Sequence, residues 1–238
     1  MLTERLGLSA VLLFERVGST LDVAHRIAPD AVAGTLVLAE EQTAGRGRQG
    51  RRWSSAAGAG IWLTLVERPM DLDALDVLSL RCGLYTAEAL DTLADSPVGV
   101  KWPNDLYVGA RKLAGILIEI RWRGALPDWV AIGFGLNVVA PELETGIGLR
   151  RGVTRLAALE RLVPALRRAA AAVGQLDPAE LARWSAKDVA AGRRLTAPSP
   201  GWAAGVTPRG ELLVVDDAGV HTPHRTGSLT FADSIACS

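Results

Sequence analysis

The chain has 238 residues, enough to bury the core of one large domain or of a main domain with a small appendage. Its 26 basic residues equal its 26 acidic residues in number, so no overall charge favours a nucleic acid or a membrane as partner. No run approaches the roughly 20 apolar residues of a membrane-spanning helix, and the two cysteines, Cys82 and Cys237, form no disulfide framework. These features predict a cytoplasmic protein in which any binding of anions comes from a local site and not from the overall charge.

Apolar patterning predicts strands and helices along the first 190 residues. In chain order, the expected elements are a strand at 11–14, a helix at 21–27, strands at 35–39 and 61–66, one or two helices within 71–93, a short strand from Val98 that stops at Pro103, strands at 113–120 and 130–138, and helices at 154–173 and 178–190. Ser19 or Thr20 is placed to cap the first helix through its hydroxyl. The helical segment at 71–93 carries no obvious chemistry and is interpreted as scaffold.

Residues 43–53 form a loop rich in glycine and arginine between two predicted strands. Glycines let the backbone bend sharply, and the planar guanidinium groups suit carboxylate and phosphate, so this loop is expected to hold an anion. Gly45, Gly47 and Gly50 also match the dinucleotide pattern G-x-G-x-x-G, but a strand rather than a helix follows, which disfavours that interpretation. A mobile arginine loop in solvent remains the simpler alternative.

Polar residues gather where the strand from Val98 stops. Lys101, Asn104 and Asp105 lie there and can project into a site, although a plain Pro-Asn-Asp turn gives the same residues without function. Lys112 precedes a buried strand, where a partly desolvated lysine can face a carboxylate or phosphate; an exposed turn lysine is the alternative. Two glycines in strand 130–138 indicate a bulge or the close approach of a ligand.

The character of the chain changes near residue 192, where short strands separated by turns predict a small β appendage of about fifty residues. His221 and His224 have no partners that would make a metal site and are interpreted as exposed. The basic residues of helix 154–173 are interpreted as a solvated face; they are Arg155, Arg161, Arg167 and Arg168.

Four blocks of sequence together are specific enough to indicate a family: residues 45–53, 101–106, 111–119 and 133–138. In motif, order and spacing they resemble the biotin–protein ligases. The resemblance covers about residues 11–140, and the C-terminal piece is similar in kind to the SH3-like barrel that ends these ligases. It implies an α+β fold, class II synthetase-like, with a mixed sheet flanked by helices in a catalytic domain at 1–190 and an SH3-like β domain at 191–238.

This resemblance also implies a reaction in two steps. Biotin and ATP, with Mg²⁺, form biotinyl-5′-AMP and pyrophosphate, and a lysine of a biotin carboxyl carrier domain of an acyl-CoA carboxylase, such as acetyl-CoA carboxylase, then takes the biotin. The sequence leaves no room for the DNA-binding domain of bifunctional relatives, so no DNA partner is expected. A homodimer is possible, and the sequence does not decide it.

The resemblance assigns roles residue by residue. Lys112, Arg48 and Asp105 are implied as catalytic, and Asp105 also as the ligand of Mg²⁺. Trp53, Asn104 and Asn137 are implied on the ATP side, with a plain loop anchor as the alternative for Trp53. The residues implied around biotin and its adenylate are Ser19, Thr20, Gln42, Gly45, Arg46, Gly47, Arg48, Lys112, Gly115 and Gly133.

Leu21 departs from the family pattern, which commonly has asparagine there, and one polar contact of the pocket is lost. The glycine content predicts that loop 45–53 is mobile without ligand and ordered with it. Two other functions stay open: a ligase for lipoate or another acyl carboxylate, which shares the fold and the chemistry, and a non-catalytic module that binds biotin.

Overall fold

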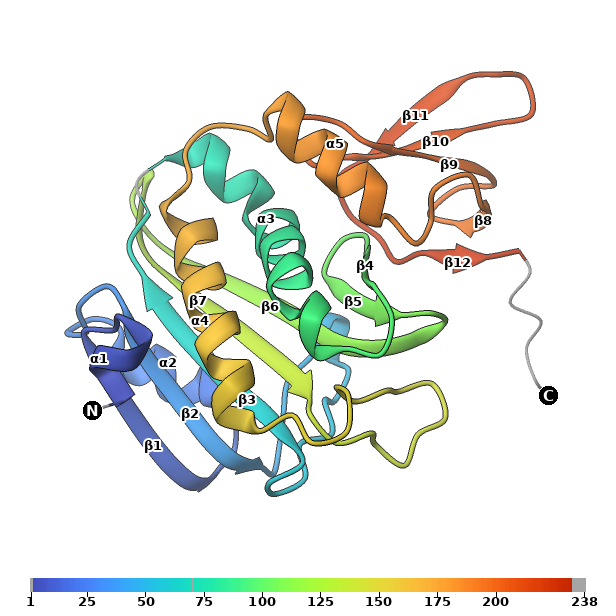
Figure 1. Ribbon diagram of the computed structural model, residues 1–238. Helices are drawn as coiled ribbons and strands as arrows, with labels where there is room; N and C mark the ends of the chain where they lie inside the picture. Colours follow the sequence, from blue (N-terminus) through green and yellow to red (C-terminus); the bar gives the residue numbers. More distant parts are fainter. Residues whose placement is uncertain (1, 70, 233–238) are drawn as a thin grey trace.

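The computed structural model describes residues 2–69 and 71–232, and its main feature is a mixed seven-stranded sheet in the order β1-β2-β3-β7-β6-β5-β4 (Figure 1). Strands β1 and β2 are parallel, and the remaining neighbours are antiparallel. The strands are β1 (Ala10–Val17), β2 (Thr35–Gln42), β3 (Gly60–Glu67), β4 (Val98–Lys101), β5 (Asp105–Val108), β6 (Arg111–Arg123) and β7 (Leu126–Asn137).

Helices cover both faces of this sheet (Figure 1). They are α1 (Leu2–Leu6), α2 (Thr20–Ile27), α3 (Leu72–Leu90), α4 (Arg155–Ala171) and α5 (Pro178–Lys187). Successive side chains of a strand point to opposite faces, so Leu36 joins the core beneath α3 and α4 while Val37 joins a smaller core beneath α2. The expected mixed sheet flanked by helices is confirmed.

The C-terminal part forms a second, antiparallel sheet of five short strands in the order β11-β10-β9-β8-β12. They are β8 (Arg194–Ala197), β9 (Gly201–Val206), β10 (Leu212–Val215), β11 (His221–His224) and β12 (Thr230–Phe231). This sheet is consistent with the expected SH3-like domain. It docks on the seven-stranded sheet through the buried Trp102, whose indole N–H donates to the carbonyl of Gly210 at 3.0 Å.

Several elements differ from the sequence expectation. Strand β5 was not expected because its residues read as the continuation of a turn, and helix α1 was not expected because five residues are too few to show a helical period. Most strands extend beyond their apolar runs because neighbouring strands supply backbone partners at either end. Cys82 is a free, buried cysteine whose thiol pKa burial raises to about 12, and Cys237 lies outside the described residues. Within the described ranges no helix is long and apolar enough to cross a bilayer.

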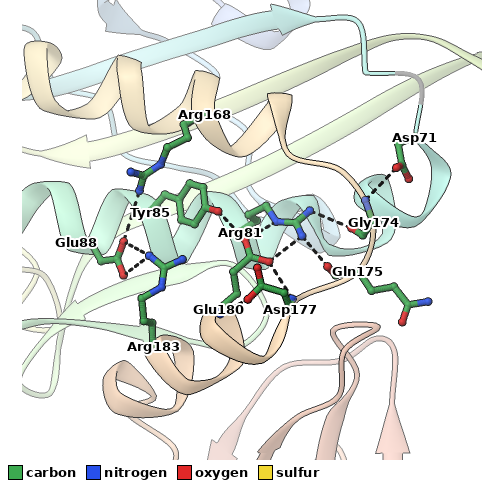
Figure 2. Close-up of polar contacts among 10 residues, drawn as sticks. All are labelled: Asp71, Arg81, Tyr85, Glu88, Arg168, Gly174, Gln175, Asp177, Glu180 and Arg183. Carbon is green, nitrogen blue, oxygen red and sulfur yellow. Dashed lines mark hydrogen bonds and ion pairs between the residues drawn. The ribbon is translucent and has the colours of Figure 1, made fainter.

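Helix α3 carries a buried ion pair, which the interpretation as plain apolar scaffold did not anticipate (Figure 2). Arg81 donates to both carboxylate oxygens of Glu180 on α5, at 2.7 and 2.9 Å, and Tyr85 donates to the same carboxylate at 2.6 Å. Arg81 also donates to the carbonyls of Gly174 and Gln175 in the segment between α4 and α5. One guanidinium therefore joins α3 to the segment that leads to the C-terminal sheet.

The basic residues of α4 are not simply a solvated face. Arg167 donates to the buried Glu67 at 3.0 Å, Arg155 pairs with Glu40, and the guanidinium carbon of Arg168 lies 4.1 Å from the ring centroid of Tyr85. Helix α4 thus attaches to the sheet and to α3 by charge as well as by apolar packing.

Candidate functional site

A cavity of about 270 Å³ opens on the α2 face of the seven-stranded sheet. The N-terminus of α2, the end of β2, the arginine loop, the turn between β4 and β5, and strands β6 and β7 all contribute to its wall. Ser228 and Leu229 of the C-terminal part complete it. Segments that are far apart in the sequence therefore meet at one place.

Three glycines form the floor of the cavity: Gly115 on β6 and Gly133 and Gly135 on β7. A Cβ atom on Gly135 would lie 2.6 Å from the indole of Trp53, and one on Gly133 would lie 3.0 Å from Leu21. Trp53 and Leu21 therefore rest directly on the sheet where side chains are missing. The sequence expectation included Gly115 and Gly133 but omitted Gly135, although the second glycine of the strand pointed to it.

One end of the cavity is a network of neutral polar groups. Gln42 Oε1 accepts from the backbone N–H and the hydroxyl of Thr20, at 2.9 and 3.1 Å, and Gln42 Nε2 donates to Ser55 at 2.8 Å. Thr64 donates to the hydroxyl of Thr20 at 2.9 Å. Ser19 stands at the N-cap of α2 but makes no side-chain capping bond, so the capping role expected for one of the two hydroxyls is wrong. These groups instead line or support the cavity.

The other end carries opposed charges. The Lys112 ammonium pairs with Asp105 Oδ1 at 2.7 Å and lies 5.1 Å from the ring centroid of Trp53. Arg48 donates to Asn104 Oδ1 at 3.2 Å, and burial lowers the pKa of its guanidinium although Asp105 opposes the shift. Asn104 in turn donates to the carbonyl of Ile116 at 2.7 Å, which fixes the amide. The structure thus brings Lys112, Arg48, Asn104 and Asp105 together, as expected.

The arginine loop is folded into a small hairpin over the cavity. Arg46 and Arg52 form an isolated bridge, Gly47 N–H donates to Arg51 at 2.8 Å, and Trp53 N–H donates to Gly45 at 2.9 Å. Arg46 binds Asp22 of α2 at 2.9 Å and also Glu119 of β6. Its guanidinium is therefore held by two carboxylates that lie outside the cavity lining, rather than by solvent alone.

Two expected residues support the site without lining it. A Cβ on Gly45 would lie 2.5 Å from the carbonyl of Trp53, so glycine is what lets the hairpin close. Asn137 is buried and donates to the carbonyl of Lys112 at 3.4 Å, so it holds the strand that carries the lysine. Conversely, Lys101 and Tyr107 line the cavity but were absent from the expected site. Tyr107 contacts Lys101 within the β4–β5 hairpin, whereas the other ring beside Lys101, that of Phe231, comes from the distant C-terminal sheet.

The electrostatics of the cavity favour an anion. Among the described residues that line it, Asp105 is the single acid, whereas the bases are Arg46, Arg48, Arg51, Arg52, Lys101 and Lys112. No group of three or more His, Cys, Asp or Glu residues in the described part of the chain is arranged to hold a metal ion by itself. A cavity with a glycine floor, neutral donors and acceptors at one end and cations at the other suits a small organic carboxylate beside a phosphate.

Replacing Gly135 by alanine should release the arginine loop. The new Cβ would overlap the Trp53 indole, which must leave the sheet and take the hairpin with it. We expect trypsin to cleave at the loop arginines at least about fivefold faster, because cleavage follows the open population. In the control Gly18→Ala, the added methyl meets no heavy atom within 4 Å and should leave the rate unchanged. Equal rates in both variants would show that Trp53 does not anchor the loop.

Comparison with known proteins agrees with this geometry. A family model described as the biotin/lipoate A/B protein ligase family matches residues 13–137. The chain is 41% identical over 116 residues to the bifunctional ligase/repressor BirA of Escherichia coli (strain K12), covering 48% of this chain and 36% of that protein. It is 43% identical over 135 residues to the biotin–[acetyl-CoA-carboxylase] ligase of Mycobacterium tuberculosis (strain ATCC 25618 / H37Rv), covering 53% and 49%. The matched segment spans half or less of these two relatives.

Solved structures extend the likeness to the C-terminal sheet. The biotin protein ligase from Aquifex aeolicus in complex with biotin and ATP superposes with a TM-score of 0.73 at 24% identity, over 94% of this chain and 99% of that one. The Leishmania major biotin protein ligase in complex with biotinyl-5-AMP gives a TM-score of 0.63 at 24% identity, over 90% and 98%. At this identity the likeness establishes the fold. The family match extends over more than half of the chain, and the protein therefore belongs to the biotin/lipoate A/B protein ligase family.

Proposed function

We propose that the protein joins biotin to the AMP part of ATP and then passes the biotinyl group to a lysine of a biotin carboxyl carrier domain. The observation that carries this proposal is the cavity itself, where a glycine floor lies between the Thr20–Gln42 network at one end and Lys112 and Arg48 at the other. The family match and the likeness to a biotin–[acetyl-CoA-carboxylase] ligase support it.

In this proposal the bicyclic ring of biotin lies against Gly115 and Gly133, and its ureido group meets Ser19, Thr20 and Gln42. Leu21, at a position where relatives commonly have asparagine, packs on Gly133 and supplies an apolar contact in place of a polar one. The carboxylate end then points to Lys112. The direction of the ligand follows from the polarity of the two ends of the cavity.

The reaction requires that biotin and ATP are held in position and that positive charge lies around the α-phosphorus. A carboxylate oxygen of biotin attacks the α-phosphorus, the bond to the bridging oxygen of the leaving group breaks, and that oxygen takes the electron pair as pyrophosphate departs. Lys112 and Arg48 neutralise the charge that accumulates on the non-bridging oxygens. Trp53 and Asn104 lie on the ATP side, and Asn137 supports Lys112 through its backbone.

Magnesium fits the donor set only together with the nucleotide. Mg²⁺ commonly uses one or two carboxylates and several phosphate oxygens, and Asp105 is the carboxylate that the cavity offers. Its ion pair with Lys112 uses Oδ1, so the second oxygen is the one that would hold the cation. When bound, Mg²⁺ adds positive charge at the phosphates.

We propose an acyl-CoA carboxylase, such as acetyl-CoA carboxylase, as the source of the carrier domain, and the cytoplasm as the place where the protein acts. The boundary near residue 190 is supported by the two separate sheets, which occupy residues on either side of it. Loop 45–53, which caps the cavity, is proposed to tighten over the adenylate and to keep water from it.

The test is a measurement of pyrophosphate release by the purified protein with Mg-ATP and either biotin or lipoate, with mass spectrometry of the acyl-adenylate. We expect release and biotinyl-AMP with biotin. Release with lipoate alone would indicate the lipoate ligases of the same family. No release with either, together with measurable biotin binding, would indicate a non-catalytic module.

A further inference from the structure

Lys101 stands at the end of β4, opposite Asp105 across the β4–β5 hairpin, and lines the cavity. Its ammonium lies 5.1 Å from the ring centroid of Tyr107 on β5 and 5.0 Å from that of Phe231 on β12. The first ring belongs to the catalytic sheet and the second to the C-terminal sheet. Two aromatic rings from different sheets therefore hold one lysine at the cavity wall.

The surroundings of Lys101 offer little negative charge. Asp105, the acid that lines the cavity, is already paired with Lys112 at 2.7 Å. Burial lowers the pKa of the Lys101 ammonium, and Lys112, Arg193 and Arg51 lower it further, while Asp105 opposes the shift. Ring faces attract a cation only modestly and do not replace a counterion. The amine is thus desolvated beside a cavity that has a surplus of cations.

The ring of Phe231 also contacts a second cation. The guanidinium carbon of Arg193, just before β8, lies 3.5 Å from the same ring centroid. Ser228 and Leu229, three and two residues before Phe231, line the cavity. The C-terminal sheet therefore reaches the site at the Lys101 side and brings a ring and a guanidinium to it.

We propose that Lys101 binds the β- and γ-phosphates of ATP, the groups that leave as pyrophosphate, and that Phe231 of the C-terminal sheet positions it. The inference rests on the proposed function and assigns the leaving-group side of the same site. As the α–β bridging bond breaks, charge moves onto the departing pyrophosphate, and a preorganised cation there stabilises it more than it stabilises bound ATP. Lys112 remains at the carboxylate and the α-phosphate.

The test compares Lys101→Met, Lys101→Arg and Phe231→Leu with the control Arg111→Met, a neighbouring base that is exposed and does not line the cavity. In pyrophosphate release, Lys101→Met should lower kcat/KM for ATP about 100-fold while biotin affinity changes less than threefold. Lys101→Arg should recover about tenfold of that loss. Phe231→Leu should lower kcat/KM about tenfold, and Arg111→Met should match the unmodified protein.

A second readout requires no turnover: calorimetric binding of inorganic pyrophosphate with Mg²⁺. Binding that weakens at least tenfold in Lys101→Met supports the assignment even if the unmodified protein adenylates neither biotin nor lipoate, so that failure of the proposed function is distinguished from failure of the inference. Unchanged pyrophosphate affinity in Lys101→Met overturns the assignment of Lys101. A full effect of Lys101→Met with none from Phe231→Leu overturns the positioning role of the C-terminal sheet.

Discussion

Replacing Lys112 by methionine lowers the rate of biotinyl-AMP formation about 10²–10³-fold, the loss typical of a removed electrostatic donor at a reacting oxygen. Methionine keeps the unbranched stem that packs near Gly115 and Trp53 but lacks the charge. The polar groups proposed to bind the ureido group of biotin, around Thr20 and Gln42, lie at the other end of the cavity, so the affinity for biotin should fall much less than the rate. Single-turnover formation of the adenylate, followed by mass spectrometry, measures this directly.

The matched control is Arg111→Met, one residue before Lys112 on the same strand and exposed. It should form the adenylate at the unmodified rate. If Lys112→Met were as active as the unmodified protein, Lys112 would not neutralise charge in the reaction, and Arg48 would be left as the catalytic cation. A circular-dichroism melt of each variant separates a lost charge from a lost fold.

Replacing Arg81 by methionine destabilises the protein by about 3–5 kcal/mol, because Glu180 then stays buried without its cationic partner. The side chains of Arg81 and Glu180 are 1% and 4% exposed, so neither can turn to solvent while the helices remain packed (Figure 2). Urea unfolding at neutral pH gives the loss. Glu180→Gln added to Arg81→Met should recover about 1–3 kcal/mol, since the second change removes the stranded charge.

The same pair makes a pH-dependent prediction. Burial raises the pKa of Glu180, but hydrogen bonds from Arg81, Tyr85 and the Asp177 backbone outweigh it and hold the pKa at about 2, below its ordinary value of 4.5. A lowered pKa contributes stability that is fully present above pH 4.5 and is lost as the pH falls towards 2. The difference in stability between the unmodified protein and Arg81→Met should therefore shrink across that range. A constant difference would contradict a charged Glu180.

Local pattern was enough to predict most of the sheet and the helices. Runs such as residues 35–39 and 61–66 are apolar and β-branched, and a buried strand needs little else. Strand β5 could not be seen because its four residues, Asp105–Val108, read as the continuation of a turn. It forms because β4 and β6 supply backbone partners on both sides, which is a tertiary effect.

Part of the site, too, could be predicted from the sequence, and part depends on tertiary contacts. The resemblance to the biotin–protein ligases predicted Lys112, Arg48 and Asp105, and the structure places them at one end of the cavity. Lys101 was noted at the strand end but not placed in the site, since its contact with Phe231 forms only when the C-terminal sheet folds beside it. Arg81 was missed for a related reason: its partner Glu180 lies on another helix, and no local pattern joins them.

The most direct test of the account is the intact mass of a purified biotin carboxyl carrier domain after incubation with the protein, biotin and Mg-ATP. We predict the mass increase of one biotinyl group, located by peptide mapping on one lysine, that depends on ATP and is lost with Lys112→Met. If biotinyl-AMP accumulates while the carrier domain stays unmodified, only the first half-reaction is supported. If neither the adenylate nor the modified carrier domain forms, the proposed function is contradicted.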